Sequence, residues 1–181
     1  LPATSGSVIV AGRNIANLND EEAALFRRNT LGFVFQDFNL VETLTVRENI
    51  MLPLMFKNEG IKSMKEKSEK VSKSLGILHI LNKRTQEISG GQAQRTAIAR
   101  AIVHQPELLL PDEPTGNLDS ANSEEVMKIF ENLNRNYGMS TFLVTHDVET
   151  ATYSQRVIFI KDGKIYNEIR KGNNLIEYRE N

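Results

Sequence analysis

Apolar residues in the second half of the chain follow two different periods. Residues 107–112 and 140–146 are short apolar runs that end in polar side chains. Between these runs, apolar residues recur at helical spacing and a glycine follows that would end the helix: Val126, Ile129, Phe130 and Leu133, then Gly138. A strand, a helix and a strand in this order predict a parallel sheet with helices on its faces, which is an α/β fold.

The first half of the chain alternates between strand and helix patterns in the same way. Asn19 and the pair Thr45 and Glu48 are predicted to cap two helices, and Pro53 should bend or end the second helix. Gly76 is predicted to stop a lysine-rich helix, whose charges favour a solvated face. The predicted elements are a strand with a turn, a helix, a buried strand and two further helices, at residues 6–15, 19–29, 31–36, 45–56 and 62–76.

Three more elements complete the predicted order. Residues 94–103 and 147–154 indicate helices. Residues 156–169 indicate a hairpin whose two-residue turn is Asp162-Gly163.

Polar residues follow three of the predicted strands: Gln36, the pair Asp112 and Glu113, and His146. In open parallel sheets, ligands bind beyond the carboxyl ends of the strands. One carboxylate could hold Mg²⁺, and the next could orient or deprotonate an attacking water. His146 could contact a developing phosphate charge, and Gln36 could reach both metal and water. Each residue alone has an ordinary structural explanation, but the four in register favour phosphoryl transfer.

Two glycines stand directly before a strong helical pattern, in the sequence Ser89-Gly90-Gly91-Gln92. Bare amides at a helix N-terminus, supported by the helix dipole, can bind an anion. The alternative is a loop that happens to contain two glycines. This segment by itself favours neither explanation.

Composition narrows the class of protein only slightly. Hydrophobic residues make up 40% of the chain and charged residues 25%, as in ordinary globular domains. The formal net charge of −1 argues against a broad nucleic-acid-binding face. There are no cysteines, which excludes disulfides and thiol chemistry. No apolar run is long enough to predict a membrane span.

Ordered motifs in the chain resemble those of ATP-binding cassette (ABC) ATPases. ISGGQ at residues 88–92 resembles their signature motif, and LLLPDEPTGNLDS at 108–120 resembles their Walker B strand, catalytic glutamate and D-loop. VTHD at 144–147 resembles the switch-histidine segment, and VFQDFNL at 34–40 resembles the Q-loop. The resemblance covers essentially the whole chain. It implies a P-loop NTPase (RecA-like) core with a parallel sheet, an N-terminal antiparallel β segment and an inserted helical subdomain.

The resemblance also implies a role for each motif residue. Gln36 in the Q-loop would sense Mg²⁺ and lie near the contact with the membrane permease. Asp112 would be the Mg²⁺ partner, and Glu113 would be the general base for water. His146 would act at the γ-phosphate of ATP, and Asp119 would communicate across a dimer. The residues that would face ATP held by the opposite subunit are Ser89, Gly90, Gly91 and Gln92. Two chains would then sandwich two ATP molecules in a head-to-tail dimer.

Two features depart from the family pattern. None of the 11 glycines begins the phosphate loop G-x-x-x-x-G-K-[ST], and the resemblance starts at a segment that normally follows this loop. We therefore expect an N-terminally incomplete domain, and ATP hydrolysis by the 181 residues alone at or near background. Pro111 stands in the Walker B run, where proline cannot donate to a ladder. Either one hydrogen bond is lost there, or the strand is already ending.

The resemblance is strongest to exporters of lipoproteins, macrolides and antimicrobial peptides of the bacitracin type. It implies an ATP-hydrolysing subunit that powers export through a separate membrane permease, at the cytoplasmic face of a bacterial membrane. An ABC-type regulatory protein and a non-catalytic remnant remain as alternatives.

The predicted single domain spans residues 1–181 and has three parts. These parts are a β segment with the Q-loop, a helical subdomain that would dock the permease, and the remaining motifs with the C-terminal hairpin, at residues 1–40, 41–87 and 88–181.

Overall fold

The structure of the protein is a computed structural model that describes residues 3–171 and 176–179. The predicted domain also includes residues 1–2, 172–175 and 180–181, which lie outside the described residues. The chain forms two compact units, Leu1–Val144 and Thr145–Asn181, and each unit is described by itself below.

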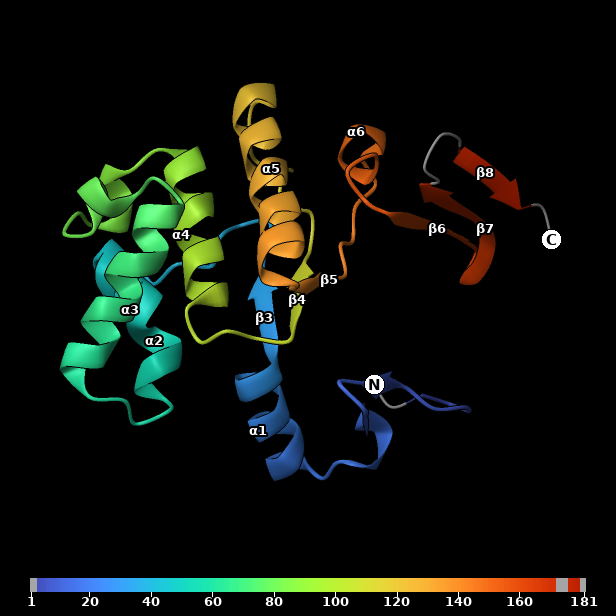
Figure 1. The fold of residues 1–181 in the computed structure, drawn as a ribbon, viewed down its shortest axis with the longest axis horizontal. Helices are drawn as coiled ribbons and strands as arrows, with labels where there is room; N and C mark the ends of the chain where they lie inside the picture. The colour runs from blue at the N-terminus through green and yellow to red at the C-terminus, as the bar shows by residue number, and fades with distance from the viewer. Residues whose placement is uncertain (1–2, 172–175, 180–181) are drawn as a thin grey trace. The chain divides into compact units, whose positions relative to one another are not determined.

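The centre of the first unit is a three-stranded sheet, drawn in Figure 1. Its strands are β3 (Leu31–Val34), β4 (Leu108–Pro111) and β5 (Ser140–Thr141), in this spatial order. Both neighbouring pairs are parallel, which confirms the sheet predicted from the apolar runs. The last run was expected to form a strand over residues 140–146, but β5 ends at Thr141 and pairing resumes only as an isolated bridge at Val144.

Pro111 accounts for the early end of β5. The register places Leu109 opposite Thr141, and the Val144 N–H donates to the Pro111 carbonyl at 2.9 Å. In a parallel ladder of this register, the residue at position 111 would donate to the Phe142 carbonyl. Proline has no N–H to donate. The structure therefore places Pro111 inside the paired strand, with one ladder bond lost.

Only one face of the sheet is buried. Gly32, Val34 and Leu109 point into the core, whereas Phe33 and Phe142 on the other face are 37% and 59% exposed. The expectation of a strand buried throughout residues 31–36 was therefore wrong. A Cβ atom at Gly32 would lie 2.5 Å from the Ala101 carbonyl oxygen. Glycine is required there because the backbone of a helix lies directly against the strand.

Five longer helices accompany this sheet in the first unit as described: α1 (Asp20–Thr30), α2 (Val46–Met55), α3 (Ile61–Ser74), α4 (Gly90–Ile102) and α5 (Ser120–Tyr137). The 3-10 turn η1 (Ile15–Asn17) precedes α1, and the turns η2 (Leu78–Ile80) and η3 (Thr85–Glu87) lie between α3 and α4. Asn19 and Thr45 form capping boxes at α1 and α2, as predicted. Gly76 and Gly138 follow α3 and α5 with φ of +69° and +64°, which agrees with their predicted role as stops.

Two helices show how far the predicted details hold. Helix α2 contains Pro53 and ends two residues later, at Met55, within one residue of the predicted range 45–56. Proline is tolerated so near the helix end because few intrahelical bonds remain to be broken. On α5, the buried face includes Met127, whereas Ile129 is only half-buried.

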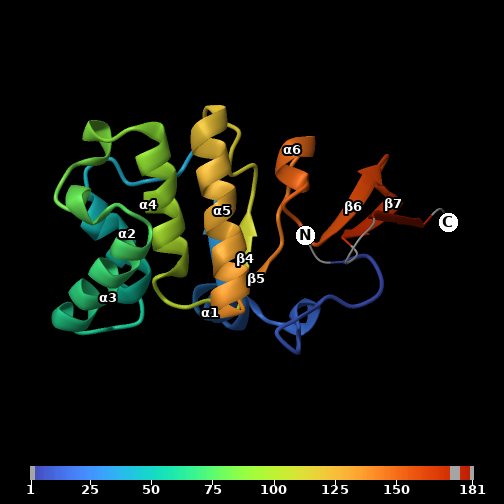
Figure 2. The same cartoon turned by 45° about the horizontal axis from the view of Figure 1, so that its top comes forward.

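Helix α4 is the centre of the packing. It lies between the pair α2 and α3 on one side and α5 on the other, and it also contacts β3 (Figures 1 and 2). Nine of its 13 residues are buried, so it is a core helix rather than an amphipathic surface helix. A shift of α4 would therefore disturb the packing of α2, α3 and α5, which all contact it.

The N-terminal segment forms the predicted strand with a turn. Strands β1 (Ile9–Val10) and β2 (Arg13–Asn14) pair in antiparallel fashion. The two residues between them, Ala11 and Gly12, have φ of +50° and +73°. These left-handed values are typical of a tight hairpin turn.

The second unit contains a short helix and an antiparallel sheet. Helix α6 (Val148–Ala151) precedes β6 (Arg156–Lys161), β7 (Lys164–Lys171) and β8 (Ile176–Arg179). The spatial order is β6-β7-β8. Asp162 and Gly163 form the predicted turn between β6 and β7, with φ of +50° and +73°. In neither unit does a described helix combine the length and the apolar character needed to cross a membrane.

Candidate functional site

The backbone beyond β4 is held from both sides. The Asp112 N–H donates to the Val34 carbonyl of β3 at 2.8 Å, and the Glu113 N–H donates to the Val144 carbonyl at 2.9 Å. The backbone from which the two carboxylates leave the sheet is therefore fixed on both sides.

Glu113 has an unusual backbone conformation. Its φ is +47°, in the left-handed region that non-glycine residues rarely adopt, and its side chain is half-buried. Asp112, by contrast, is exposed. A strained residue at the end of a central strand is a frequent mark of a functional position. The chain turns away from the sheet here and leads into the loop of residues 114–119.

Gln36 lies against that loop. A Cβ atom at Gly116 would be 2.8 Å from Nε2 of Gln36. The Asn117 side-chain amide donates to the Gln36 carbonyl at 3.1 Å and to the Asp37 carboxylate at 2.9 Å. The structure thus brings Gln36 next to the segment that carries Asp112 and Glu113. Gly116 and Asn117 were not singled out in the sequence, because a Gly-Asn pair commonly indicates only a turn.

The loop is also tied to α4. Gln94 of α4 is fully buried, and its side-chain amide donates to the Pro114 carbonyl, one residue after Glu113. This contact fixes the loop directly behind the carboxylates. Gln94 carries no signal in the sequence that would separate it from an ordinary polar residue in a helix.

The start of α4 is a capping box. Ser89 Oγ accepts from the Gln92 N–H at 3.3 Å, and Gln92 Oε1 accepts from the Ser89 N–H at 3.1 Å. A Cβ atom at Gly91 would lie 2.2 Å from Asn122 Oδ1, whereas at Gly90 the nearest atom would be 3.8 Å away. Close packing of α4 on α5 is therefore one reason for glycine at position 91. The predicted anion-binding role of this helix start stays a prediction.

Asp119 is the N-cap of α5. Its carboxylate accepts from the Asn122 N–H at 2.9 Å and from the Asn122 side-chain amide at 2.7 Å. These hydrogen bonds, led by the one from the Asn122 backbone, lower the pKa of Asp119. The contact shows that Asp119 has a structural role within the chain. The predicted role of Asp119 across a dimer stays a prediction.

His146 belongs to the second unit. It precedes Asp147, whose carboxylate caps α6 and accepts from the Thr150 hydroxyl and N–H. Hydrogen bonds from the Thr150 side chain and backbone lower the pKa of Asp147. The proposed contact between His146 and a γ-phosphate stays a prediction.

The oxygen donors near this edge of the sheet suit Mg²⁺. The side-chain amide of Gln36 and the carboxylate of Asp112 both offer hard oxygen ligands. Among the described residues, no group of three or more His, Asp or Glu side chains could hold a metal ion. A magnesium ion bound by two protein ligands would complete its coordination with water and substrate phosphates, as Mg²⁺ commonly does.

The chain has clear relatives among known proteins. The ABC transporter family profile matches residues 1–116. The chain belongs to the ABC transporter family. Within it, the ABC transporter ATP-binding protein YxdL of Bacillus subtilis (strain 168) is 53% identical over 170 residues, which cover 94% of this chain and 66% of YxdL. The bacitracin export ATP-binding protein BceA of Halalkalibacterium halodurans is 44% identical over 169 residues, which cover 93% of this chain and 67% of BceA.

A solved ABC transporter cassette has the same fold. The dimeric structure of MJ0796 from Methanocaldococcus jannaschii matches with a TM-score of 0.84 and 37% identity, over 94% of this chain and 76% of that one. A dimeric post-hydrolysis state of MJ0796 bound to ADP and Pi matches with the same TM-score and 36% identity. The P-loop NTPase fold and the family predicted from the motifs are thus confirmed. The chain spans about two thirds of the length of the relatives that it matches, 66% for YxdL.

Proposed function

We propose that this ABC chain binds ATP with Mg²⁺ and forms part of a machine that hydrolyses it. The observation that carries the proposal is the placement of Asp112 and Glu113 directly beyond the central strand of a parallel sheet, with Gln36 held against the same loop. Ligands bind at that edge of such sheets. The cassette MJ0796, which shares the fold, has been solved with ADP and Pi.

The residues near the carboxyl ends of the strands have different roles in this proposal. Asp112 and Gln36 would hold a magnesium ion that arrives with ATP, and that ion would stabilise charge at the phosphates. Glu113, which follows Asp112 directly beyond the central strand, accepts a proton from the attacking water or orients it. Its resemblance to the switch histidine of the family assigns His146 to the γ-phosphate of ATP.

We infer that two copies of the chain act together, each presenting Ser89, Gly90, Gly91 and Gln92 to the ATP of the other. Both MJ0796 structures are dimers, which supports this assembly.

A separate permease, docked on the helical subdomain at the cytoplasmic face of a bacterial membrane, carries the transported molecule. Similarity to BceA favours export of bacitracin-type antimicrobial peptides.

The test uses a version of the chain that carries a phosphate loop ahead of residue 1. Glu113→Gln keeps the size of the side chain and removes its negative charge. ATP hydrolysis should fall by roughly 10²–10⁴-fold, which is the usual contribution of general acid–base catalysis. ATP binding, measured with a fluorescent ATP analogue, should be retained because Asp112 and Gln36 are unchanged.

Glu107→Gln is the matched control, because Glu107 stands at the opposite end of the same strand, next to Leu108. It should leave turnover unchanged. Wild-type turnover in Glu113→Gln would show that the base is wrongly assigned. No turnover in the version with unaltered Glu113 would contradict the proposed activity itself.

A further inference from the structure

The four residues Gln36, Asp37, Phe38 and Asn39, here called the Gln36 loop, adopt a strained turn. Phe38 and Asn39 are consecutive residues with φ of +61° and +47°. A bulky residue such as Phe38 rarely takes a left-handed conformation unless its surroundings enforce it. The Phe38 N–H donates to the Phe35 carbonyl at 3.2 Å, which is a local bond typical of a tight turn. The surrounding structure must therefore hold this loop in place.

Arg100 of α4 holds the far end of the loop. Its guanidinium donates to the Phe38 carbonyl at 2.8 Å and to the Asn39 carbonyl at 2.6 Å. Arg100 is half-buried, and in the described structure no carboxylate pairs with it. Burial lowers its pKa. A half-buried cation whose partners are two carbonyls of one turn is suited to fixing the conformation of that turn, because a guanidinium presents its donors in a rigid fork.

Asn117 and Gly116 hold the near end of the loop. Asn117 donates to the Gln36 carbonyl and to the Asp37 carboxylate. Gly116 leaves room for the Gln36 side chain, since a Cβ atom there would lie 2.8 Å from its Nε2 and 3.1 Å from its Cδ. Four polar contacts of the loop thus reach residues that are more than 60 positions away in sequence.

We propose that Arg100, Gly116 and Asn117 are positioning residues that set the place of the Gln36 side chain. They clamp the Gln36 loop between α4 and the loop that carries Glu113. Helix α4 also carries the Ser89 end, so one rigid helix connects that end to the Gln36 loop. If the proposed function is correct, the Ser89 end of α4 meets the ATP of the partner chain, and Gln36 binds the magnesium ion of the chain's own ATP. Helix α4 then links these two sites mechanically. Only this consequence rests on the proposed function.

The first experiment needs no nucleotide and uses the 181-residue chain as it exists. Chymotrypsin cleaves after Phe38 when the loop opens. Asn117→Ala and Arg100→Ala should each raise the rate of cleavage there by about fivefold or more, because the rate follows the population of the locally open state. Asn117→Asp keeps the shape but loses the donor, so it should behave like Asn117→Ala. Arg100→Lys should rescue only in part, because lysine lacks the fork.

Asn136→Ala is the matched control, since Asn136 is an exposed asparagine of α5 that bonds only to Asn132 in the described structure. Its cleavage rate after Phe38 should equal that of the wild type. Equal rates for Asn117→Ala, Arg100→Ala and the control would overturn the clamp. Unfolding by circular dichroism identifies any variant that opens globally rather than locally.

A second experiment separates positioning from a general structural effect. Gly116→Ala should push the Gln36 side chain aside, so it should raise the Mg²⁺ concentration needed for half-maximal ATP hydrolysis in the version with a phosphate loop. In a Gln36→Ala background the three atoms nearest to the added methyl group, all from the Gln36 side chain, are removed, so Gly116→Ala should have little further effect. Equal effects in both backgrounds would overturn the positioning role. If the unaltered protein shows no turnover, the proposed function fails, and the proteolysis result still decides the clamp.

Discussion

At the scale of single residues, Pro111 lowers the stability of the fold, because it leaves out one hydrogen bond of the ladder between β4 and β5. The carbonyl of Pro111 is used, since it accepts from the Val144 N–H, but its nitrogen offers no donor on the side of Phe142. An unmade ladder bond costs about 0.5–1.5 kcal/mol of net stability. The same position fixes the backbone from which Asp112 and Glu113 leave the sheet.

Replacing Pro111 by valine should raise the free energy of unfolding by about 0.5–1.5 kcal/mol, because the restored N–H can donate to the Phe142 carbonyl and the apolar bulk is kept. Pro111→Ala restores the same donor but gives up two methylene groups, worth about 0.8 kcal/mol each when buried. It should therefore be less stable than Pro111→Val. Urea unfolding measures both differences. A Pro111→Val variant less stable than the wild type would contradict the assigned hydrogen bond.

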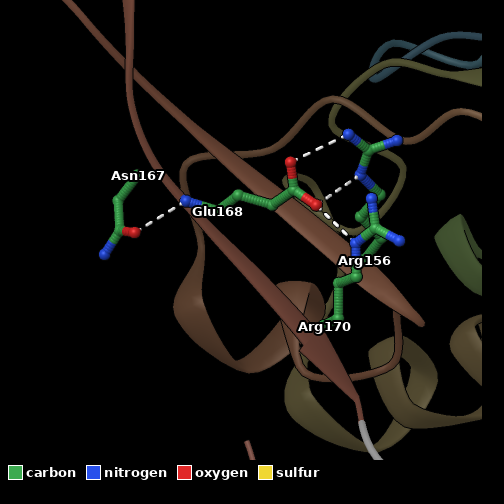
Figure 3. Close-up of polar contacts among 4 residues, drawn as sticks. All are labelled: Arg156, Asn167, Glu168 and Arg170. Atoms are coloured by element: carbon green, nitrogen blue, oxygen red, sulfur yellow. Dashed lines mark hydrogen bonds and ion pairs between the residues drawn. The ribbon is translucent and has the colours of Figure 1, made fainter. Parts of the chain in front are cut away.

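Glu168 on β7 is a second residue with an unusual local environment, and its neighbours set the pKa of its carboxylate (Figure 3). Its carboxylate accepts from Arg156 at 2.8 and 3.0 Å and from Arg170 at 2.5 Å. The hydrogen bonds from Arg156, followed by those from Arg170, lower the pKa of Glu168 from 4.5 to about 2. These contacts join β6 and β7 on one face of the hairpin.

This lowered pKa predicts the direction of a pH effect. A carboxylate with a depressed folded pKa stabilises the fold fully above its unfolded pKa of 4.5, and this contribution is lost as the pH falls toward 2. The wild type should therefore exceed Glu168→Gln in melting temperature at neutral pH, and the difference should shrink below pH 4.5. Carbon NMR titration should place the Glu168 midpoint near 2, and Arg156→Gln should raise it.

Lys164→Gln is the control for this titration, because Lys164 lies on the same strand as Glu168 and makes no ion pair in the described structure. It should leave the Glu168 midpoint almost unchanged. A midpoint near 4.5 in the wild type would contradict the arginine contacts as the cause.

At the scale of elements, α4 is the helix on which the first unit depends. Its Gly91 end packs on α5, its Gln94 side chain holds the Pro114 carbonyl, and its Arg100 end holds the Gln36 loop. The two glycines at its start have different surroundings, since only position 91 lacks room for a side chain. Their effects on stability should therefore differ.

Gly91→Ala should lower the free energy of unfolding by about 1–3 kcal/mol, the usual cost of overpacking, because the methyl group collides with Asn122. Asn122 cannot move freely, as it bonds to Asp119. Gly90→Ala is the matched control and should be neutral or slightly stabilising, since alanine favours helix and has space there. Thermal unfolding compares the two.

Asn122→Ala offers a second check, because it removes the colliding amide. Gly91→Ala should cost much less in that background. A cost that is independent of residue 122 would contradict the packing explanation.

At the scale of the whole molecule, the proposed dimer depends on the start of α4. In the version with a phosphate loop, Glu113→Gln should bind ATP without hydrolysing it and accumulate as an ATP-dependent dimer. Adding Ser89→Arg should abolish that dimer, because a long side chain would block the helix N-terminus, while ATP binding to the monomer should persist. Light scattering with and without ATP measures the association.

The control for this experiment is Ser74→Arg, which introduces the same charge at an exposed position at the end of α3. It should leave the dimer intact. A dimer that survives Ser89→Arg, or that forms without ATP, would argue against the head-to-tail arrangement.

The amino-acid sequence by itself determined the features that depend on neighbouring residues. Asn19, Thr45, Gly76 and Gly138 mark helix ends where the structure has them, because caps and left-handed stops act over one turn. The hairpin turn at Asp162-Gly163 could be predicted for the same reason, since it depends on two consecutive residues. The α/β order and the motif residues could also be predicted, because apolar periodicity and motif spacing are properties of the chain itself.

Tertiary structure alone decided which contacts join distant segments. The exposed face of β3, the need for glycine at positions 32 and 91, and the clamp on the Gln36 loop all depend on residues far away in sequence. No local pattern distinguishes Asn117 or Arg100 from any other polar residue in a turn or a helix. Their significance arises only when the packing of α4 brings the Gln36 loop and the loop beyond β4 to the same edge of the sheet, because a hydrogen bond needs its partners within about 3 Å whatever their distance along the chain.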